Sequence, residues 1–280
     1  MKFRTDKSIL LTELLKAKIG CSMTKVKKKI SQDDIFINGK LISEHNPEVP
    51  AGSVVELKAK ALIPKDNISI LYEDEHIIAV EKPCGLLTNQ SKNDKKDTLL
   101  FKVSNYLKTK SHGKTRAFIV HRLDQKVSGI VIFAKNKETE SYLIKNWYKF
   151  EKTYHALVEG HPKEKEGKIV SWLYEDRNLK VHSGAKREDS KEAITFYSVD
   201  KRFRQFSLIA VKLGTGRKNQ IRVHMADLGC PIVGDFKYGA SANSIGRIGL
   251  HAHTMKLIHP ESQKELVIKC PTPQSFMRFK

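Results

Sequence analysis

The sequence predicts an α+β protein with a small N-terminal domain and a larger domain made mostly of strands. Most apolar residues fall in short runs rich in β-branched and aromatic side chains, which is typical of buried strands. A few longer segments instead carry apolar residues at helical spacing. Lysines, alanines and a proline over residues 58–67 indicate a linker between the two regions. A chain of 280 residues is long enough for one small and one medium domain.

The composition favours a nucleic acid as the partner. The chain has 51 lysines and arginines against 31 acidic residues, which gives a net charge of +20. A surplus of this size attracts polyanions. Binding to a membrane surface is the alternative, but the sequence has no strong amphipathic anchor and no apolar run long enough to span a bilayer. A merely soluble basic surface is the third interpretation.

The N-terminal residues and the cysteines are typical of an intracellular protein. The N-terminal residues lack the apolar core and the cleavage site of a signal peptide, so we expect a cytoplasmic location. No two of the four cysteines form a C-x-x-C pair, which argues against a zinc knuckle. We expect these cysteines to be reduced thiols.

The N-terminal domain is predicted to hold two helices followed by a hairpin. Residues 8–18 carry leucines at helical spacing, and a second helix fits residues 24–32. Three lysines share one side of that second helix, namely Lys25, Lys28 and Lys29. Asn38-Gly39 between apolar runs is a strong hairpin signal, and residues 54–57 form the last strand.

This layout, over residues 8–58, resembles the S-four-type RNA-binding domain. The resemblance implies that Lys25, Lys28 and Lys29 contact RNA phosphates. Residues 22–24 depart from the family pattern, because arginines commonly stand there, and lysines provide less bidentate geometry. On the other interpretation the lysines form a solvated helix face. The expected domains are residues 1–60, a linker at 61–67, and residues 68–280.

The larger domain is predicted to be strand-rich, with helices between the strands. Asp97 is expected to cap one helix and Asn136 another, the second of which reaches residue 149. A charged excursion over residues 163–193 suggests a side hairpin, and residues 229–239 suggest a strand and a turn. The other expected strands are residues 68–72, 77–80, 118–120, 130–134, 152–160, 194–199, 206–213 and a short one from 250.

A polar hinge interrupts two buried strands at the centre of this domain. Arg122 and Asp124 lie in the segment His-Arg-Leu-Asp, between the apolar runs 118–120 and 130–134. A carboxylate on a loop between rigid strands is a common way to build an active site. The other interpretation is that Asp124 only starts a turn, as Asp often does.

A second polar stretch lies near the start of a predicted helix. Arg217 and Arg222 stand at or near that start, while Ile221 and Met225 are spaced to face the core. The Gly-Thr-Gly before it lacks the Rossmann and P-loop spacings. His251 and His253 have no acidic or cysteine partner nearby, so we expect structural histidines and no metal site.

Four motifs, in order, resemble those of the RluA-type pseudouridine synthases. They are the His-Arg-Leu-Asp segment ending at Asp124, Lys-Pro-Cys-Gly-Leu-Leu from residue 82, Lys-Thr-Tyr ending at Tyr154, and the Gly-Arg-Lys-Asn-Gln-Ile-Arg segment ending at Arg222. The similarity covers residues 68–275. It implies a central mixed, mainly antiparallel sheet flanked by helices. Asn219 departs from the pattern, because many members carry histidine there, and this affects a supporting contact.

The resemblance implies an enzyme that converts uridine in RNA to pseudouridine. Asp124 would be the catalytic carboxylate, Tyr154 would pack on the target base, and Arg222 would be the ion partner of Asp124. A carboxylate near C1′ can stabilise positive charge on the sugar, attack it, or remove a proton from C2′. The residues do not choose among these. The reaction is redox-neutral, so we expect no metal or organic cofactor.

Two basic residues are expected to contact the RNA near the reacting base. Arg217 is one of them. Arg122 is a candidate for filling the space that the base vacates when it leaves its stack, at a cost of a few kcal/mol. The alternative is that Arg122 only contacts a phosphate.

The appended N-terminal domain favours large-subunit ribosomal RNA over tRNA as the substrate. A competing interpretation is a non-catalytic RNA-binding or ribosome-assembly factor, but the presence of Asp124, Tyr154 and Arg222 together argues against it. We expect RNA as the partner, no membrane association, and a monomer.

Overall fold

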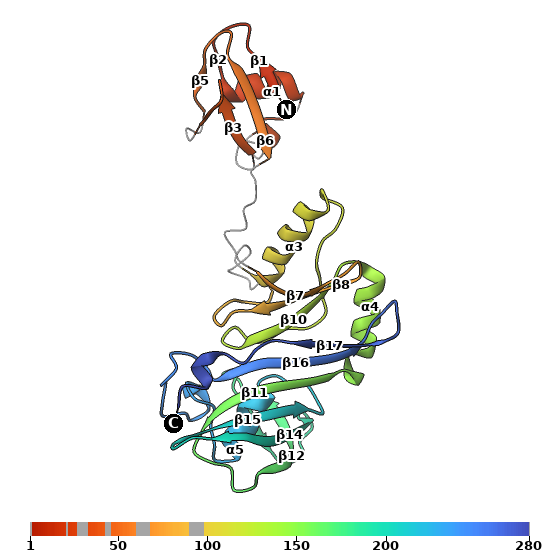
Figure 1. Ribbon diagram of the computed structural model, residues 1–280, viewed down its shortest axis with the longest axis vertical. Coiled ribbons are helices and arrows are strands. Elements are labelled where there is room, and N and C mark those ends of the chain that lie inside the picture. The colour runs from red at the N-terminus through yellow and green to blue at the C-terminus, as the bar shows by residue number, and fades with distance from the viewer. Residues whose placement is uncertain are drawn as a thin grey trace. The chain divides into compact units, whose positions relative to one another are not determined.

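The protein is described here by a computed structural model, which covers residues 2–20, 22–26, 33–42, 46–59, 68–89 and 98–279. The chain divides into two compact units, residues 1–65 and 66–280 (Figure 1). Each unit has a hydrophobic core of its own. In the described part of the chain, no helix is long and apolar enough to cross a bilayer.

Over its described residues, the small unit contains a four-stranded sheet on which helix α1 packs. In sheet order the strands are β1 (Lys2–Arg4), β6 (Val54–Ala59), β3 (Asp33–Ile37) and β4 (Lys40–Leu41). Helix α1 (Leu11–Ile19) buries its leucines against Ile35, Val55 and Leu57. A second, two-stranded sheet pairs β2 (Ile9–Leu10) with β5 (Glu48–Val49).

The hairpin turn at Asn38-Gly39 forms as the sequence predicts. Both residues have positive φ, 51° and 81°, as a two-residue hairpin requires. The side-chain oxygen of Asn38 accepts a hydrogen bond from the Val54 backbone N–H at 2.8 Å. Strand β1 was not expected, because a three-residue strand carries too short a pattern. Of the predicted helix 24–32, residues 24–26 are helical and residues 27–32 lie outside the described residues.

The larger unit is built on an eleven-stranded sheet (Figure 1). The order along it is β13-β12-β14-β15-β11-β16-β10-β8-β7, with β17 beside β16 and β9 beside β10. Its strands are β7 (Ser69–Glu73), β8 (Ile77–Lys82), β9 (Phe118–Ile119), β10 (Ser128–Ala134), β11 (Glu151–Glu159), β12 (Glu166–Glu175), β13 (Val181–Gly184), β14 (Lys191–Arg202), β15 (Phe206–Leu213), β16 (Leu250–Ile258) and β17 (Glu265–Lys269). Among the described strands only β10 and β16 pair in parallel, so the predicted mixed, mainly antiparallel sheet is confirmed.

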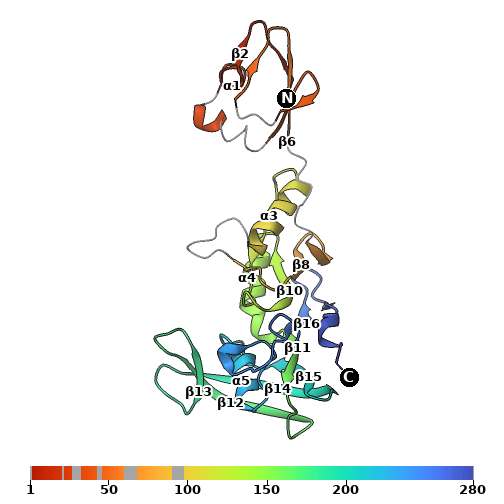
Figure 2. The same ribbon diagram turned by 90° about the vertical axis from the view of Figure 1, so that its left-hand side faces the viewer.

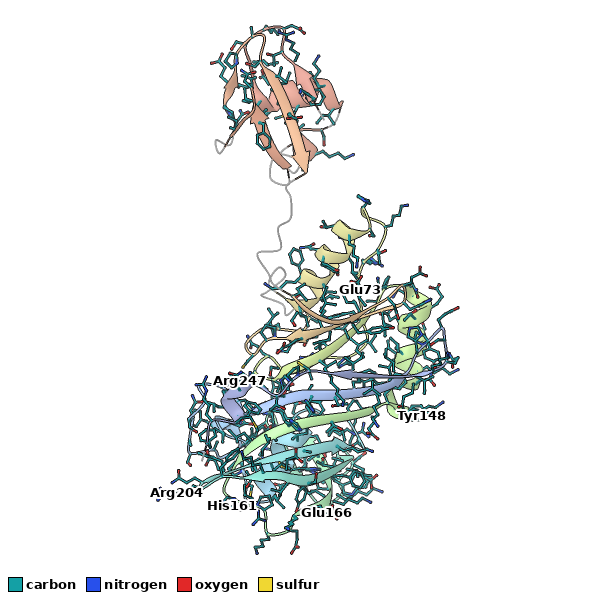
Figure 3. All side chains as sticks on the ribbon, viewed as in Figure 1. Glu73, Tyr148, His161, Glu166, Arg204 and Arg247 are labelled. Atoms are coloured by element: carbon teal, nitrogen blue, oxygen red, sulfur yellow. The ribbon has the colours of Figure 1, made fainter. Side chains whose placement is uncertain are left out.

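Helices cover both faces of this sheet. Helix α3 (Leu99–Lys110) and helix α5 (Gln220–Asp227) contribute to the core on one face, and α4 (Lys137–Asn146) contributes to the core on the other. Strand β10 is buried along its whole length, with alternate residues in the two cores. Glu73 on β7 ties α3 to the sheet, because it accepts hydrogen bonds from Tyr106 and Lys110, both at 2.8 Å (Figure 3).

The helix predicted after Asn136 and the side hairpin predicted within residues 163–193 both form. Two other predictions for the larger unit, the cap at Asp97 and the strand within residues 229–239, need correction. Asn136 caps α4 as expected, with its side chain accepting from the Thr139 N–H. The cap of α3, however, is Thr98, whose hydroxyl accepts from the Phe101 N–H, whereas Asp97 lies outside the described residues. Residues 229–239 form turns and a short 3₁₀ helix rather than a strand, because a single bridge from Ile232 to Val158 does not extend into a ladder. The side hairpin β12–β13 extends from the end of the sheet beside α5 (Figure 2).

Gly129 allows the two parallel strands β10 and β16 to meet. Its φ is +113°, and a Cβ atom there would lie 2.3 Å from the backbone oxygen of Ala252 on β16. No other residue type fits such a position without moving the backbone. Gly129 therefore fixes how closely the start of β10, and with it the hinge before it, approaches β16 and β11.

Replacing Gly129 by alanine should destabilise the larger unit by about 2–4 kcal/mol, from strained φ and steric overlap together. Urea unfolding followed by tryptophan fluorescence measures this unit, since both tryptophans, Trp147 and Trp172, lie in it. The control is Gly184→Ala, where the nearest atom to a new Cβ is 3.7 Å away. Equal stability of the two variants would contradict the role of Gly129.

Candidate active site

The hinge that carries Asp124 is held in place from both ends. The Val127 N–H closes a turn onto the Asp124 carbonyl at 3.0 Å. At the other end, His121 stacks on Trp147 and its Nε2 accepts from the Ile132 N–H at 2.9 Å. Burial, with the charge of Lys152, lowers the pKa of His121 to about 3. The ring therefore stays neutral at neutral pH, as an acceptor must.

A second loop, residues 83–88, is hydrogen-bonded along the hinge. The Thr88 hydroxyl donates to the Leu123 carbonyl at 2.8 Å and accepts from the Leu123 N–H at 3.1 Å. The Gly85 N–H donates to the Gln125 carbonyl at 2.8 Å. Both backbone neighbours of Asp124 are therefore anchored, which limits where its carboxylate can go.

Lys82 joins this loop to the hinge from inside the protein. It is fully buried, and its ammonium group donates to the carbonyls of Pro83, Leu86 and Gln125 at 2.7–3.1 Å. Burial lowers the pKa of Lys82 to about 8, so the ammonium is still mostly charged at neutral pH. A buried ammonium is tolerated here because three carbonyl oxygens accept its protons.

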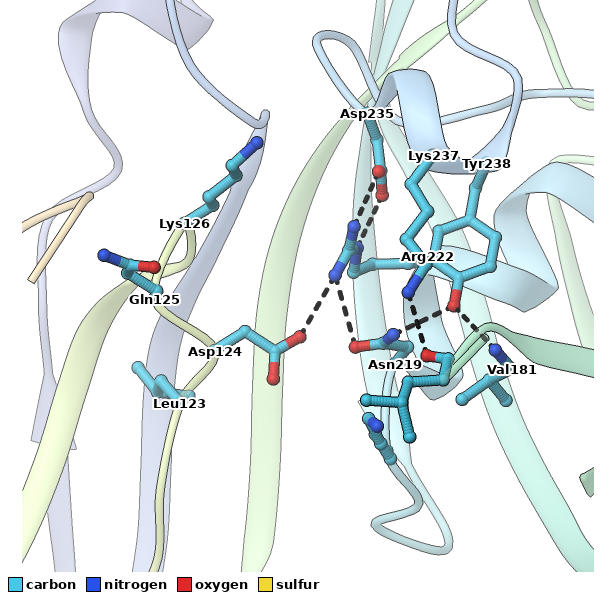
Figure 4. Close-up of polar contacts among 12 residues, drawn as sticks. Leu123, Asp124, Gln125, Lys126, Val181, Asn219, Arg222, Asp235, Lys237 and Tyr238 are labelled. Carbon is cyan, nitrogen blue, oxygen red and sulfur yellow. Dashed lines mark hydrogen bonds and ion pairs between the residues drawn. The ribbon is translucent and has the colours of Figure 1, made fainter. Parts of the chain in front are cut away.

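Helix α5 delivers an arginine to the carboxylate of Asp124 (Figure 4). Arg222 donates through Nε and Nη2 to the two oxygens of Asp235, at 2.6 and 2.7 Å. Its remaining nitrogen, Nη1, lies 3.3 Å from Oδ2 of Asp124. Burial alone would lower the pKa of Arg222, but the hydrogen bonds and charge of Asp235, with the charge of Asp124, raise it. The guanidinium is therefore permanently charged.

The loop before α5 is fixed by the amide of Gln220. Its oxygen accepts from the Arg217 N–H and the Thr215 hydroxyl, and its nitrogen donates to the Ile194 carbonyl and the Thr195 hydroxyl, all within 2.8–2.9 Å. Every hydrogen-bonding group of this buried amide is engaged. Gln220 thus determines the shape of the wall that stands opposite the hinge.

The hinge and this wall enclose a pocket of about 470 Å³. Asp124 retains 35% side-chain exposure, so its carboxylate faces the pocket, whereas Asp235 retains 1%. The lining combines apolar and aromatic side chains with cationic ones. The lining residues are Arg122, Leu123, Asp124, Val127, Tyr154, Leu213, Gly216, Arg217, Lys218, Asn219, Gln220, Ile221, Arg222 and Leu250.

Tyr154 brings an uncharged ring to this pocket from strand β11. Burial, together with the carboxylate of Asp124, raises the pKa of Tyr154 well above its ordinary value. The phenol is therefore protonated at neutral pH, and its ring offers a flat surface against which a base can pack.

The structure brings five of the sequence-predicted site residues to one pocket, namely Arg122, Asp124, Tyr154, Arg217 and Arg222. Lys25 is exposed in the small unit, and Lys28 and Lys29 lie outside the described residues. His251 is hydrogen-bonded to the Ser128 hydroxyl, and His253 is hydrogen-bonded to the Cys270 carbonyl. Within the described ranges, no group of three or more histidines, cysteines and acids is arranged to hold a metal.

Sequence reasoning did not identify the residues that support the pocket. Lys82 and Gln220 stand inside two of the four motifs, and Asp235 lies in the predicted turn at residues 229–239, so these segments were the available signal. Their roles depend on partners far along the chain: Lys82 bonds to Gln125 and Gln220 to Ile194. Spacing within a motif does not reveal such partners.

Comparison with known proteins identifies the family. A family model described as RNA pseudouridylate synthase matches residues 76–227. An uncharacterized RNA pseudouridine synthase of Aquifex aeolicus is 32% identical, over 91% of this chain and 87% of its own length. The chain belongs to the RluA-type RNA pseudouridine synthases. The expectation of this family, and of an enzyme, is confirmed.

A second sequence relative and one solved structure also resemble this chain. The ribosomal large subunit pseudouridine synthase D of Borreliella burgdorferi is 33% identical, over 83% of this chain and 71% of its own length. The solved structure of human RNA pseudouridylate synthase domain containing 4 covers 75% of this chain and 90% of its own, with a TM-score of 0.64 and 22% identity. The second likeness supports the predicted fold.

Proposed function

We propose that this synthase modifies uridines in large-subunit ribosomal RNA and that Asp124 is its catalytic carboxylate. The observation that carries the proposal is the pairing of a partly exposed Asp124 carboxylate with the largely buried Arg222 guanidinium in a pocket lined by Tyr154. The printed name of the Borreliella burgdorferi relative supports the choice of ribosomal RNA.

The chemistry of the reaction matches this arrangement. In the isomerisation the bond from N1 of uracil to C1′ breaks, a bond from C5 to C1′ forms, the hydrogen on C5 leaves as a proton, and N1 gains one. Positive charge develops on the sugar, where a fixed carboxylate at C1′ is most stabilising. Arg222 places its positive charge beside Asp124 and orients the Asp124 carboxylate, and the buried Asp235 keeps Arg222 in place.

The detached uracil must stay in the pocket while it rotates. Tyr154, Leu213 and Leu250 supply an apolar surface for the ring, and a pocket of about 470 Å³ is of the usual size for one small ligand. Because Tyr154 remains a neutral phenol, it packs without placing a charge beside the leaving base.

Replacing Asp124 by asparagine should lower the chemical rate by more than about 10³-fold, because the amide keeps the shape but not the charge. Release of tritium from RNA labelled at uridine C5 measures the rate, and filter binding measures RNA affinity, which should be retained. Asp189→Asn, at an exposed carboxylate that is 56% accessible, is the control. Undiminished release by the Asp124 variant would refute the assignment.

Arg122 is proposed to enter the stack when the target base leaves it. Its side chain is exposed and lines the pocket, while the adjacent Leu123 is buried in the core. Arg217 lies at the same pocket, and its Nε is bonded to the Glu192 carbonyl at 3.0 Å.

Replacing Arg122 by alanine should slow the reaction on a structured RNA hairpin by about 10–100-fold, since unstacking costs a few kcal/mol. On a short single strand the rate should change little, because there is no stack to refill. Tritium release from both RNAs makes the comparison, with Arg204→Ala, at another exposed arginine (Figure 3), as the control. An equal loss of rate on both RNAs would indicate that Arg122 contacts a phosphate instead. In that case the slope of log affinity against log salt concentration should also fall by about one.

The small unit is proposed to be an S-four-type domain that holds the RNA substrate. Helix α1, the helical residues 24–26 with the exposed Lys25, and the hairpin at Asn38-Gly39 fit that resemblance. A second binding module on the same chain raises affinity for a long RNA that can reach both units.

A chain that begins at residue 66 should bind a long ribosomal RNA fragment about 10²-fold more weakly, as expected when one of two linked sites is lost. Its rate on a short oligonucleotide that reaches only the pocket should stay near that of the full chain. Gel-shift titrations measure the first quantity and tritium release the second. Unchanged affinity for the long fragment would show that the small unit serves another purpose.

A further inference from the structure

Asn219 stands at the position before helix α5, but its side chain does not cap the helix. Asparagine is favoured at such positions because its side chain can accept a hydrogen bond from the first helical N–H groups. Here the side chain makes no capping bond, and the Val223 N–H bonds to the backbone oxygen of Asn219 at 3.0 Å. The residue is in the left-handed region, at φ 54° and ψ 16°, which asparagine tolerates better than most residues. Its amide is thus free for other partners.

Those partners are Arg222 and Tyr238 (Figure 4). Arg222 Nη1 donates to Asn219 Oδ1 at 3.2 Å, and Asn219 Nδ2 donates to the Tyr238 hydroxyl oxygen at 2.9 Å. Because a guanidinium only donates, the oxygen end of the amide has to face Arg222 and its nitrogen end Tyr238. The orientation of the amide follows from the chemistry of its two neighbours.

Tyr238 is itself firmly held. Its side chain is buried, its oxygen accepts from the Val181 N–H at 3.3 Å, and its ring lies under the guanidinium of Arg222 with 4.9 Å from Cζ to the ring centroid. Strand β13 and the turn after α5 therefore both support the amide of Asn219.

Nη1 of Arg222 is the nitrogen that faces the reaction. Asp235 binds Nε and Nη2 on one side, and the two hydrogens of Nη1 are directed to Asn219 and to Asp124. We propose that Asn219 is a positioning residue: by holding one Nη1 hydrogen it aims the other at Asp124, and so sets the rate of the chemical step. This inference rests on the proposed role of Asp124.

The substitution that tests the inference is Asn219→Gly, which removes the amide and keeps the backbone conformation available. Single-turnover tritium release should fall about 10–100-fold, the usual effect of losing a partner that orients an active group. RNA affinity and the urea unfolding midpoint should stay at the wild-type values. Gln263→Gly is the matched control, since Gln263 is also an amide at φ 54°, in a turn away from the pocket.

Two more variants separate positioning from a structural role. Asn219→His should retain most of the rate. A neutral histidine offers one acceptor nitrogen in place of the amide oxygen and one N–H donor in place of the amide NH2 group, and it tolerates positive φ. Tyr238→Phe should lower the rate by less than Asn219→Gly does. Combining Tyr238→Phe with Asn219→Gly should cause no further loss, because both act on one contact.

A wild-type rate for Asn219→Gly, a loss confined to RNA affinity, or an Asn219→His variant as slow as Asn219→Gly would each overturn the inference. Asp124→Asn, measured in parallel, distinguishes the two proposals. If Asp124→Asn releases tritium at full rate, the proposed function itself fails. If Asp124→Asn is inactive while Asn219→Gly reacts normally, only the role of Asn219 is lost.

Discussion

The site depends on one largely buried guanidinium shared by two carboxylates. Arg222 has 11% side-chain exposure, and taking its charge out of water would be costly without compensation. Asp235, buried and bound through both oxygens, provides that compensation. Since Asp235 already neutralises the guanidinium, Arg222 can approach Asp124 without the tight two-point grip that would hold Asp124 away from a substrate. The 3.3 Å contact through one nitrogen leaves the carboxylate accessible.

The rest of the larger unit keeps the two sides of this contact in register. On one side, Lys82, Thr88 and His121 fix the backbone around Asp124. On the other, the amide of Gln220 fixes the loop from which α5 begins. The strand β10 that follows the hinge pairs in parallel with β16, and Gly129 allows these two strands to approach each other. Rigid walls of this kind hold charged groups at fixed positions without reorganisation during the reaction.

Much of the fold could be predicted from local patterns. The hairpin at Asn38-Gly39 and the cap at Asn136 depend on residues next to each other, and both form. The cap at Thr98 was misplaced by one residue, because Ser, Thr and Asp are nearly equivalent caps and the sequence places Asp97 beside Thr98. The strand expected within residues 229–239 does not form, since its one bridge, from Ile232 to Val158, does not extend into a ladder.

By itself the sequence determined the α+β class and the order of the motifs, because these follow from residue type and spacing. It also gave Asp124, Tyr154 and Arg222 as candidates, because the motifs that hold them resemble those of a known family. The tertiary structure shows the contact between Asp124 and Arg222, 98 residues apart, which the resemblance implied. Only the tertiary structure decided that Asp235 and Asn219 take up the other donors of Arg222, and that the buried Lys82 supports the hinge. The physical reason is that hydrogen bonds and burial join residues by distance in space. A chain's own spacing records only the partners that lie within a turn or a strand of each other.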